Sequence, residues 1–149
     1  MSMSNDVEQL TLNKVLPLRV EVLRKGTPTT HCTYPEDSYD DAVHLGIVRD
    51  GQVVATSTWF TKACPLEDNA SAVQLKGMAV SETLQGEGLG EQLIAAGVAL
   101  AMERGVTLVW ARARDSALGF YLKCSFAAVG DGFIDEPTGM PHHIVIRRL

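Results

Sequence analysis

The stretch Gln85-Gly86-Glu87-Gly88-Leu89-Gly90 decides the fold of this chain and the kind of ligand it binds. It follows an apolar run from Val73 to Val80 and opens a segment with helical periodicity. A strand, a tight glycine-rich turn and a helix N-terminus form an anion-binding site, because backbone N–H groups converge there and the helix dipole adds partial positive charge. The turn therefore predicts a phosphate or pyrophosphate ligand.

The spacing of the turn excludes the two commonest phosphate-binding loops. A P-loop ends in Gly-Lys followed by Ser or Thr, whereas Gly90 is followed by Glu91. A dinucleotide fingerprint needs glycines at relative positions 1, 3 and 6, and the sixth position counted from Gly86 is Glu91. The pattern that fits is Gln/Arg-x-x-Gly-x-Gly/Ala, with Gln85, Gly88 and Gly90 at its fixed positions.

A second motif lies downstream of the turn, in the segment from Ala117 to Phe126. Its sequence fits Ala-x-x-Phe-Tyr-x-x-x-Gly-Phe, with Tyr121 at the tyrosine and Ser125 at the glycine position. The two motifs, in this order and at this separation, resemble the GCN5-related N-acetyltransferase (GNAT) family. In that family the glycine-rich turn cradles the pyrophosphate of coenzyme A. The resemblance extends from about Ala42 to Leu149.

The resemblance implies an α/β fold: a mixed, mostly antiparallel sheet, splayed between its fourth and fifth strands, with helices on both faces. The length of 149 residues fits a single N-acetyltransferase domain spanning 1–149. Hydrophobic periodicity and turn signals predict a compatible order of elements. These are a helix within 7–25, strands over 42–48 and 52–60, a strand over 74–80, a helix over 89–103, a strand over 106–111, a helix over 115–124, and strands over 126–130 and 144–148.

The resemblance also implies the residues that hold the cofactor, acetyl-CoA or coenzyme A. The turn binds the pyrophosphate and the strand before it pairs with the pantetheine arm. The implied cofactor-binding residues are Met78, Ala79, Val80, Gln85, Gly86, Glu87, Gly88, Leu89, Gly90 and Tyr121. Tyr121 is also the expected general acid for the leaving thiolate, and a backbone N–H at Ala79 or Val80 the expected oxyanion donor.

Glu87 departs from the family, because many relatives place Arg or Lys inside the turn. A carboxylate beside a pyrophosphate repels it, so we expect weaker binding unless the side chain points to solvent. Arg112 or Arg114 is a candidate for a compensating cation.

The general base is less well defined by the sequence. Some family members carry a glutamate four residues before Met78, where this chain has Gln74, which cannot take a proton. The remaining candidates lie in or beside the last loop: His142, His143, Asp135 and Glu136. Adjacent histidines in a strand point to opposite faces, so only one of them can face the pocket, and His142 is the preferred candidate. A water relay to solvent is the alternative.

Composition excludes several other classes of protein. The net charge of −5, without a basic block, argues against a nucleic-acid partner, and no run of eighteen apolar residues predicts a membrane span. Cys32, Cys64 and Cys124 form no Cys-x-x-Cys pair, so we expect three free thiols and a cytoplasmic location. No zinc-site spacing is present, so no metal is expected. Residues 1–6 carry no secretory signal and are expected to be disordered or a cloning remnant.

We therefore predict an acetyl-CoA-dependent N-acetyltransferase that acetylates a primary amine of a small molecule or peptide by direct attack in a ternary complex. The alternatives are a non-catalytic CoA or acyl-CoA sensor and a purely structural α/β domain. Three further stretches are similar to a small bacterial subgroup of the family whose acceptors are mostly unassigned. These stretches are Arg19-x-x-x-Leu23-Arg24, His44-Leu45-Gly46 and Gly139-Met140-Pro141-His142. A homodimer is one candidate assembly.

Overall fold

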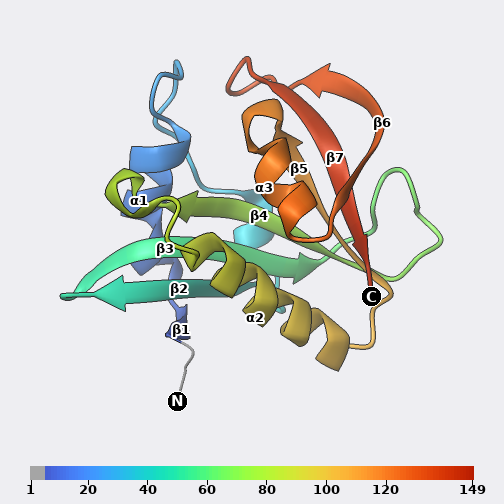
Figure 1. Cartoon of the computed structure of the whole chain (residues 1–149), viewed down its shortest axis with the longest axis horizontal. Coiled ribbons are helices and arrows are strands. Elements are labelled where there is room, and N and C mark those ends of the chain that lie inside the picture. Colours follow the sequence, from blue (N-terminus) through green and yellow to red (C-terminus); the bar gives the residue numbers. More distant parts are fainter. Residues whose placement is uncertain (1–5) are drawn as a thin grey trace.

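The computed structural model describes residues 6–149 and contains one seven-stranded sheet with the strand order β1-β2-β3-β4-β5-β7-β6 (Figure 1). Neighbouring strands are antiparallel except β4 and β5, which are parallel. The elements are β1 (Val7–Leu10), α1 (Leu12–Leu23), β2 (Val43–Arg49), β3 (Gln52–Thr61), β4 (Ala72–Val80), α2 (Leu89–Glu103), β5 (Leu108–Arg114), α3 (Leu118–Lys123), β6 (Ala127–Ile134) and β7 (Pro141–Arg148). Short 3₁₀ turns η1 (Pro35–Ser38), η2 (Glu82–Leu84) and η3 (Asp115–Ala117) lie between them.

The N-terminal segment differs from the prediction. In place of one helix within 7–25, residues Val7–Leu10 form an edge strand antiparallel to β2, and the helix begins at Leu12. Leu10 packs closely on Gly46: a Cβ atom added to Gly46 would lie 2.4 Å from Leu10 Cδ1. A strand of four residues with one buried position shows no alternation, so the sequence did not reveal it. The prediction for residues 1–6 falls, apart from Asp6, outside the described part of the chain.

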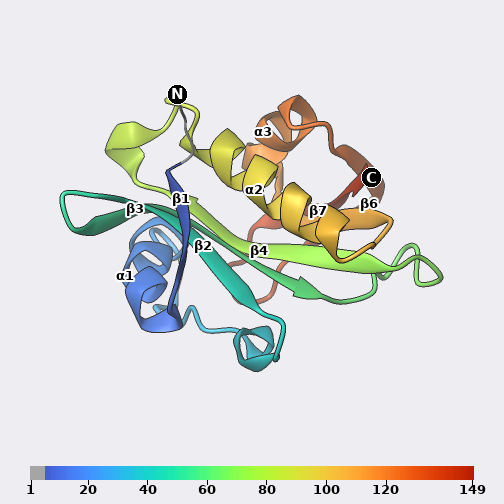
Figure 2. The same ribbon diagram turned by 90° about the horizontal axis from the view of Figure 1, so that it is seen from below.

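Helices cover both faces of the sheet: α1 lies on one face, and α2 and α3 lie on the other (Figure 2). Helix α2 turns its buried positions toward the sheet, where Gly97 lets the indole of Trp59 approach the helix backbone. Trp59 and Trp110 are both buried in the core. Cys32, Cys64 and Cys124 are free and buried, so the thiols take no part in cross-linking.

The feature that positions the site is the separation of β4 from β5. The two strands pair only from Ala72 opposite Leu108 to Leu75 opposite Ala111, and the remainder of β4 continues along β3 instead. Gly77 adopts φ +66° where the register between β3 and β4 shifts, which is a β-bulge that bends the strand. The sheet therefore opens between its fourth and fifth strands, as predicted.

The last two strands are longer than predicted. Strand β6 extends to Ile134 and strand β7 already starts at Pro141, so only residues 135–140 remain as the loop that connects them. His142 and His143 lie at the start of β7, next to this loop and opposite Arg114 and Ala113 of β5. The segment 115–124, predicted as one helix, starts as a 3₁₀ turn, and the helix α3 proper follows its N-cap residue Ala117.

Candidate active site

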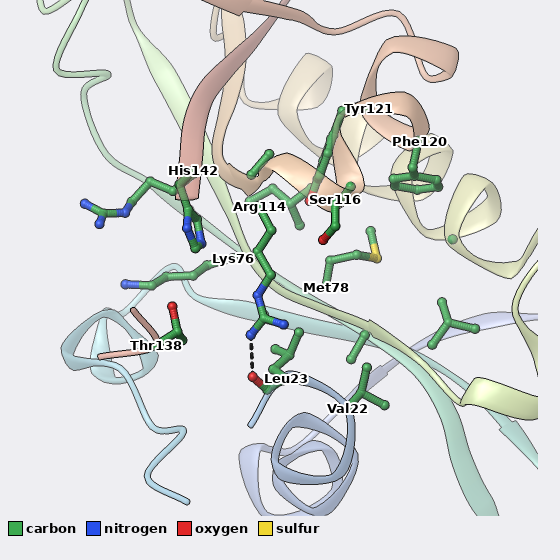
Figure 3. Close-up of a pocket in the computed structure, with 18 of the residues that line it drawn as sticks. Val22, Leu23, Lys76, Met78, Arg114, Ser116, Phe120, Tyr121, Thr138 and His142 are labelled. Carbon is green, nitrogen blue, oxygen red and sulfur yellow. Dashed lines mark hydrogen bonds between the residues drawn. The ribbon is translucent and has the colours of Figure 1, made fainter. Parts of the chain in front are cut away.

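A cavity of about 990 Å³ occupies the opening between β4 and β5. Figure 3 shows its middle, where Met78, Ser116 and Arg114 lie between His142, Lys76 and Thr138 on one side and Phe120 on the other. We call the part lined by Val80, Gln85, Gly88, Gly90 and Phe120 the turn end. The part lined by Arg24, Lys76, Arg114, Asp135 and His142 is the loop end. A single cavity therefore joins the glycine-rich turn to the last loop.

The unpaired edge of β4 lines the middle of this cavity. Ser81 N–H donates to the Val54 carbonyl across the β3–β4 ladder at 2.8 Å, and Val80 and Ala79 face Ala55 and Thr56. Because backbone groups in an antiparallel pair point alternately toward and away from the partner strand, Ala79 directs its N–H to β3 and Val80 directs its N–H to the open side. Of the two expected oxyanion donors, the register therefore selects Val80.

The turn is tied to this free edge by its first residue. Gln85 Nε2 donates to the Val80 carbonyl at 3.1 Å. Gly88 is the N-cap residue of α2 and has φ +84°, a left-handed conformation that favours glycine. Gly90 faces the Phe120 ring so closely that a Cβ would lie 2.9 Å from two ring carbons. The backbone N–H groups at the start of α2 thus open directly into the turn end of the cavity.

Nine of the ten residues predicted to bind the cofactor line this cavity, and the exception is Glu87. Its side chain is 52% exposed and lies 3.8 Å from Arg49 at the end of the β2–β3 hairpin. The carboxylate therefore points to solvent and faces a cation, which removes the repulsion expected from the sequence. The predicted compensating cations lie elsewhere: Arg112 pairs with Asp135 at 3.0 Å, and Arg114 donates to the Leu23 carbonyl.

Tyr121 projects from α3 into the cavity (Figure 3). Its ring packs edge-on against Phe120 and Phe126, with centroids 5.2 and 5.3 Å away. Within residues 6–149 its hydroxyl has no hydrogen-bond partner, so it is available to a ligand. Burial, and to a smaller degree the neighbouring Cys124, raises the pKa of the phenol above its usual value, so the hydroxyl keeps its proton at neutral pH.

His142 is held in one tautomer. Its Nδ1 lies 2.9 Å from the Met140 carbonyl oxygen, which can only accept, so Nδ1 carries the proton and Nε2 keeps its lone pair. The ring stacks on Phe133 at 5.8 Å between centroids, and it points into the cavity in Figure 3. The hydrogen bond and the stacking thus hold the imidazole in one orientation at the loop end.

The other candidates for the general base are occupied or lie elsewhere. His143 faces away and pairs with Asp115 at 2.7 Å, while Glu136 is exposed and does not line the cavity. Burial of Asp135 favours its neutral form, but hydrogen bonds from Thr138 and Arg112 outweigh it and hold its pKa below the usual value. Gln74 is buried in the sheet, away from the cavity, with no hydrogen-bond partner for its Oε1 among the described residues.

The segment before β2 forms one wall of the loop end, and a buried arginine holds it in place. Arg19 is fully buried and donates to both carboxylate oxygens of Asp37, at 2.8 and 3.0 Å, and to Thr58 Oγ1 at 2.6 Å. Its guanidinium also lies over the Tyr34 ring, 4.6 Å from the centroid. Arg19 thus anchors the segment before β2 to the sheet.

The sequence did not point to Arg24 as a cavity residue, nor to the position of Arg114 at the loop end. A partial signal existed for Arg114, because Arg112 and Arg114 alternate along β5 and so share one face of the sheet. Both arginines line the cavity. No pattern in the sequence brings Arg24, at the end of α1, to the same place.

The splayed mixed sheet and the glycine-rich turn beside its opening define an acetyltransferase fold. Residues 14–126 match the acetyltransferase (GNAT) family, and the chain belongs to this family. It is 31% identical over 141 residues to the uncharacterized N-acetyltransferase YitI of Bacillus subtilis (strain 168), covering 95% of this chain and 93% of the relative. The match begins within α1, so the likeness starts earlier than the predicted Ala42.

Solved structures agree with this assignment at the level of the fold. The crystal structure of Escherichia coli ElaA superposes with a TM-score of 0.76 at 22% identity, covering 95% of this chain and 98% of ElaA. An aminoglycoside 6'-N-acetyltransferase complexed with coenzyme A gives 0.69 at 10% identity, covering 95% and 96% of the two chains. The protein is thus an N-acetyltransferase of the GNAT family, whose members use acetyl-CoA and acetylate amines.

Two further observations concern residues 6–149. No helix among them is long and apolar enough to cross a membrane. No group of three or more His, Cys, Asp or Glu side chains in the same part of the chain is arranged to hold a metal ion.

Proposed function

We propose that this chain transfers the acetyl group of acetyl-CoA to a primary amine of a small molecule or peptide by direct attack in a ternary complex. The observation that carries the proposal is the continuous cavity, which connects the glycine-rich turn, the free edge of β4, Tyr121 and His142. The family membership supplies the reaction class, and the cavity supplies a place for each part of it.

The turn end fits coenzyme A. Backbone N–H groups from Gly86 to Gly90 converge at the N-terminus of α2, which suits a pyrophosphate. The free edge of β4, from Met78 to Val80, offers backbone groups with which an amide-rich pantetheine arm can pair as an added strand. Acetyl-CoA supplies an acetyl group activated as a thioester.

Two groups then act on the acceptor amine and on the carbonyl that it attacks. His142 Nε2 takes the proton from the incoming ammonium or from the amine as its nitrogen bonds to the acetyl carbon. Val80 N–H stabilises the negative charge that develops on the carbonyl oxygen, and such a preorganised donor contributes about 2.7–4 kcal/mol in well-studied enzymes.

Tyr121 completes the reaction. As the carbon–sulfur bond breaks, its hydroxyl gives a proton to the departing thiolate and is restored from solvent. The raised pKa keeps this donor protonated before the reaction, and the thiolate, whose conjugate acid has a lower pKa, becomes a sufficient base only as it leaves.

The first test is a thermal shift with acetyl-CoA, coenzyme A, ATP and NAD at matched concentrations. A ligand at 100 times its dissociation constant adds about 2.7 kcal/mol of stability, which shifts the melting temperature by a few degrees. We expect both CoA species to stabilise the protein and the two nucleotides to leave it unchanged. Absence of a CoA shift would favour the purely structural alternative.

Thiol release with a panel of amines then separates an enzyme from a sensor. We expect amine-dependent release of free coenzyme A. Binding without release under any amine would support the non-catalytic sensor, which the replacement of the strand glutamate by Gln74 favours. The cytoplasmic location and the homodimer stay predictions, and light scattering of the purified protein tests the second.

A further inference from the structure

The loop end of the cavity carries an excess of positive charge, although the whole chain is acidic. The loop end is lined by four cationic side chains but by only one carboxylate among the described residues. The cations are Arg24, Lys76, Arg112 and Arg114, and the carboxylate is Asp135. Asp135 forms an ion pair with Arg112 at 3.0 Å. Lys76 lies 3.4 Å from the carboxylate of Glu36, a residue that does not line the cavity. Within residues 6–149, neither Arg24 nor Arg114 has a carboxylate within ion-pair distance.

These two unpaired guanidinium groups meet at one point. Arg24 Nη1 donates to the Leu23 carbonyl oxygen at 3.3 Å, and Arg114 Nη2 makes a short hydrogen bond to the same oxygen. Arg24 Nε donates in addition to the His31 carbonyl at 2.7 Å. The remaining N–H groups of Arg114 have no acceptor among the described residues. Two like charges are thus held side by side on a cavity wall.

Capping of a helix explains only part of this arrangement. Leu23 is the last residue of α1, and a cation near a helix C-terminus is favourable. One guanidinium suffices for that, yet Arg114 reaches the same carbonyl from β5, 91 residues away in sequence. Burial and the nearby charge of Arg24 lower the pKa of Arg114, so its charged form is held at a cost that an anion between the two groups would relieve.

Arg114 also lies at a suitable place for a second recognition point. In Figure 3 its side chain extends to Leu23 through the middle of the cavity, between Met78 of the free β4 edge and the side chains of His142 and Lys76. An amine that His142 deprotonates beside that edge would have its own neighbouring group within the reach of Arg114.

We propose that the acceptor is a primary amine that also carries a carboxylate, and that Arg114 and Arg24 bind this carboxylate. Planar guanidinium groups match carboxylates with two parallel hydrogen bonds, and a half-buried site strengthens such pairs. The inference rests on the proposed acetyl transfer for its substrate class, but the anion site itself can be tested without any turnover.

The first experiment measures anion binding by the CoA-saturated protein. Saturation with coenzyme A blocks the turn, and the melting temperature is then followed with succinate and with the uncharged succinamide at equal ionic strength. We expect succinate alone to stabilise the wild type, Arg114→Gln to abolish that shift and Arg24→Gln to reduce it. Arg147→Gln is the matched control, because Arg147 also donates to a backbone carbonyl, that of Cys124, but does not line the cavity.

An equal shift from succinamide, or a succinate shift that survives in both Arg114→Gln and Arg24→Gln, would overturn the anion site. This holds whether or not any amine is acetylated, so failure here leaves the proposed acetyl transfer standing. Two variants are used so that poor folding of one of them does not remove the test.

The second experiment compares matched acceptors: β-alanine with β-alaninamide, glycine with glycinamide, and phosphoethanolamine with ethanolamine. We expect kcat/KM to be at least about tenfold higher for the carboxylate of a pair, and Arg114→Gln, but not the control Arg147→Gln, to erase that preference. Preference for the phosphate alone would replace the carboxylate by another anion and overturn the substrate class. No release with any amine, despite CoA binding, would disprove the proposed transfer and this substrate class with it, and would leave only the anion site, judged by the succinate shift.

Discussion

Gln85 Nε2 lies 3.1 Å from the Val80 carbonyl oxygen, so the first residue of the turn is fastened to the open edge of β4. This contact holds the turn, where the pyrophosphate is expected, against the strand edge that is expected to pair with the pantetheine arm. We expect Gln85→Ala to remove one neutral hydrogen bond, worth about 1 kcal/mol, and to weaken CoA binding ~5-fold.

Isothermal titration with coenzyme A measures this change. Glu87→Gln is the control within the same turn, because Glu87 is exposed and faces Arg49. We expect its dissociation constant to stay within about twofold of the wild type, since a screened surface charge contributes little. A larger gain in affinity for Glu87→Gln would show that the carboxylate does repel the cofactor.

Tyr121→Phe separates the hydroxyl from the ring. The ring keeps its contacts with Phe120 and Phe126, so stability and CoA affinity should change little. Loss of the proton donor should lower kcat by about 10²-fold or more. Steady-state kinetics with a thiol reagent checks this, and an unchanged kcat would move the general-acid role to another group or to water.

His142 and His143 form a natural matched pair. His142→Gln should lower kcat/KM by about 10²-fold, because no side chain is left to take the proton. His143→Gln removes an identical group that faces Asp115 on the opposite side of β7, and should leave kcat/KM unchanged in steady-state kinetics. Full activity of His142→Gln would favour the water relay.

The buried Glu36 predicts a loss of stability in acid. Burial favours its neutral form, but the hydrogen bond from Lys62 and the charge of Lys76 outweigh it and lower the pKa to about 2. An unfolded glutamate titrates near ~4.3, so the stabilising effect is complete above that pH and is lost as the pH falls toward 2.

Urea unfolding at several pH values measures this effect. Glu36→Gln should be less stable than the wild type at neutral pH, and the difference should shrink between about pH 4.3 and the pKa of about 2. The exposed Glu103, replaced by Gln, serves as the control and should show no such trend. A constant difference across this range would contradict the assignment to Glu36.

Ser125 occupies the glycine position of the second motif and has φ +71°. A left-handed conformation costs a non-glycine residue about 1–2 kcal/mol, partly offset in glycine by its greater freedom when unfolded. Ser125→Gly should therefore raise the stability by about 1 kcal/mol and the melting temperature by about 3 °C. Ser125→Ala, which keeps the strain, should give no gain in a thermal melt.

Much of the framework could be predicted because its signals are local. The Asp-Gly turn between β2 and β3 has the positive φ values that such a hairpin requires, +53° at Asp50 and +76° at Gly51. The glycine-rich turn, the apolar strand before it and the Phe-Tyr motif likewise lie on short stretches. Each of them is close to where the sequence placed it.

What the sequence could not predict depends on long-range geometry. The choice of Val80 over Ala79 follows from the register of β3 against β4, and the meeting of Arg24 with Arg114 requires the Arg114 side chain to reach from β5 to the end of α1. Strand β1 is too short to carry a pattern of its own. In each case the deciding neighbour is distant along the chain.

The two ends of the cavity between β4 and β5 are built from different segments of the chain. The turn end is built from one stretch of the chain, β4 through α3, whereas the loop end also draws on the end of α1, the segment before β2, the β6–β7 loop and the start of β7. Only four residue pairs of one parallel ladder join the two halves of the sheet. We therefore expect substitutions in the loop-end walls other than His142 to change which amine is accepted while leaving the glycine-rich turn and the β4 edge unaltered.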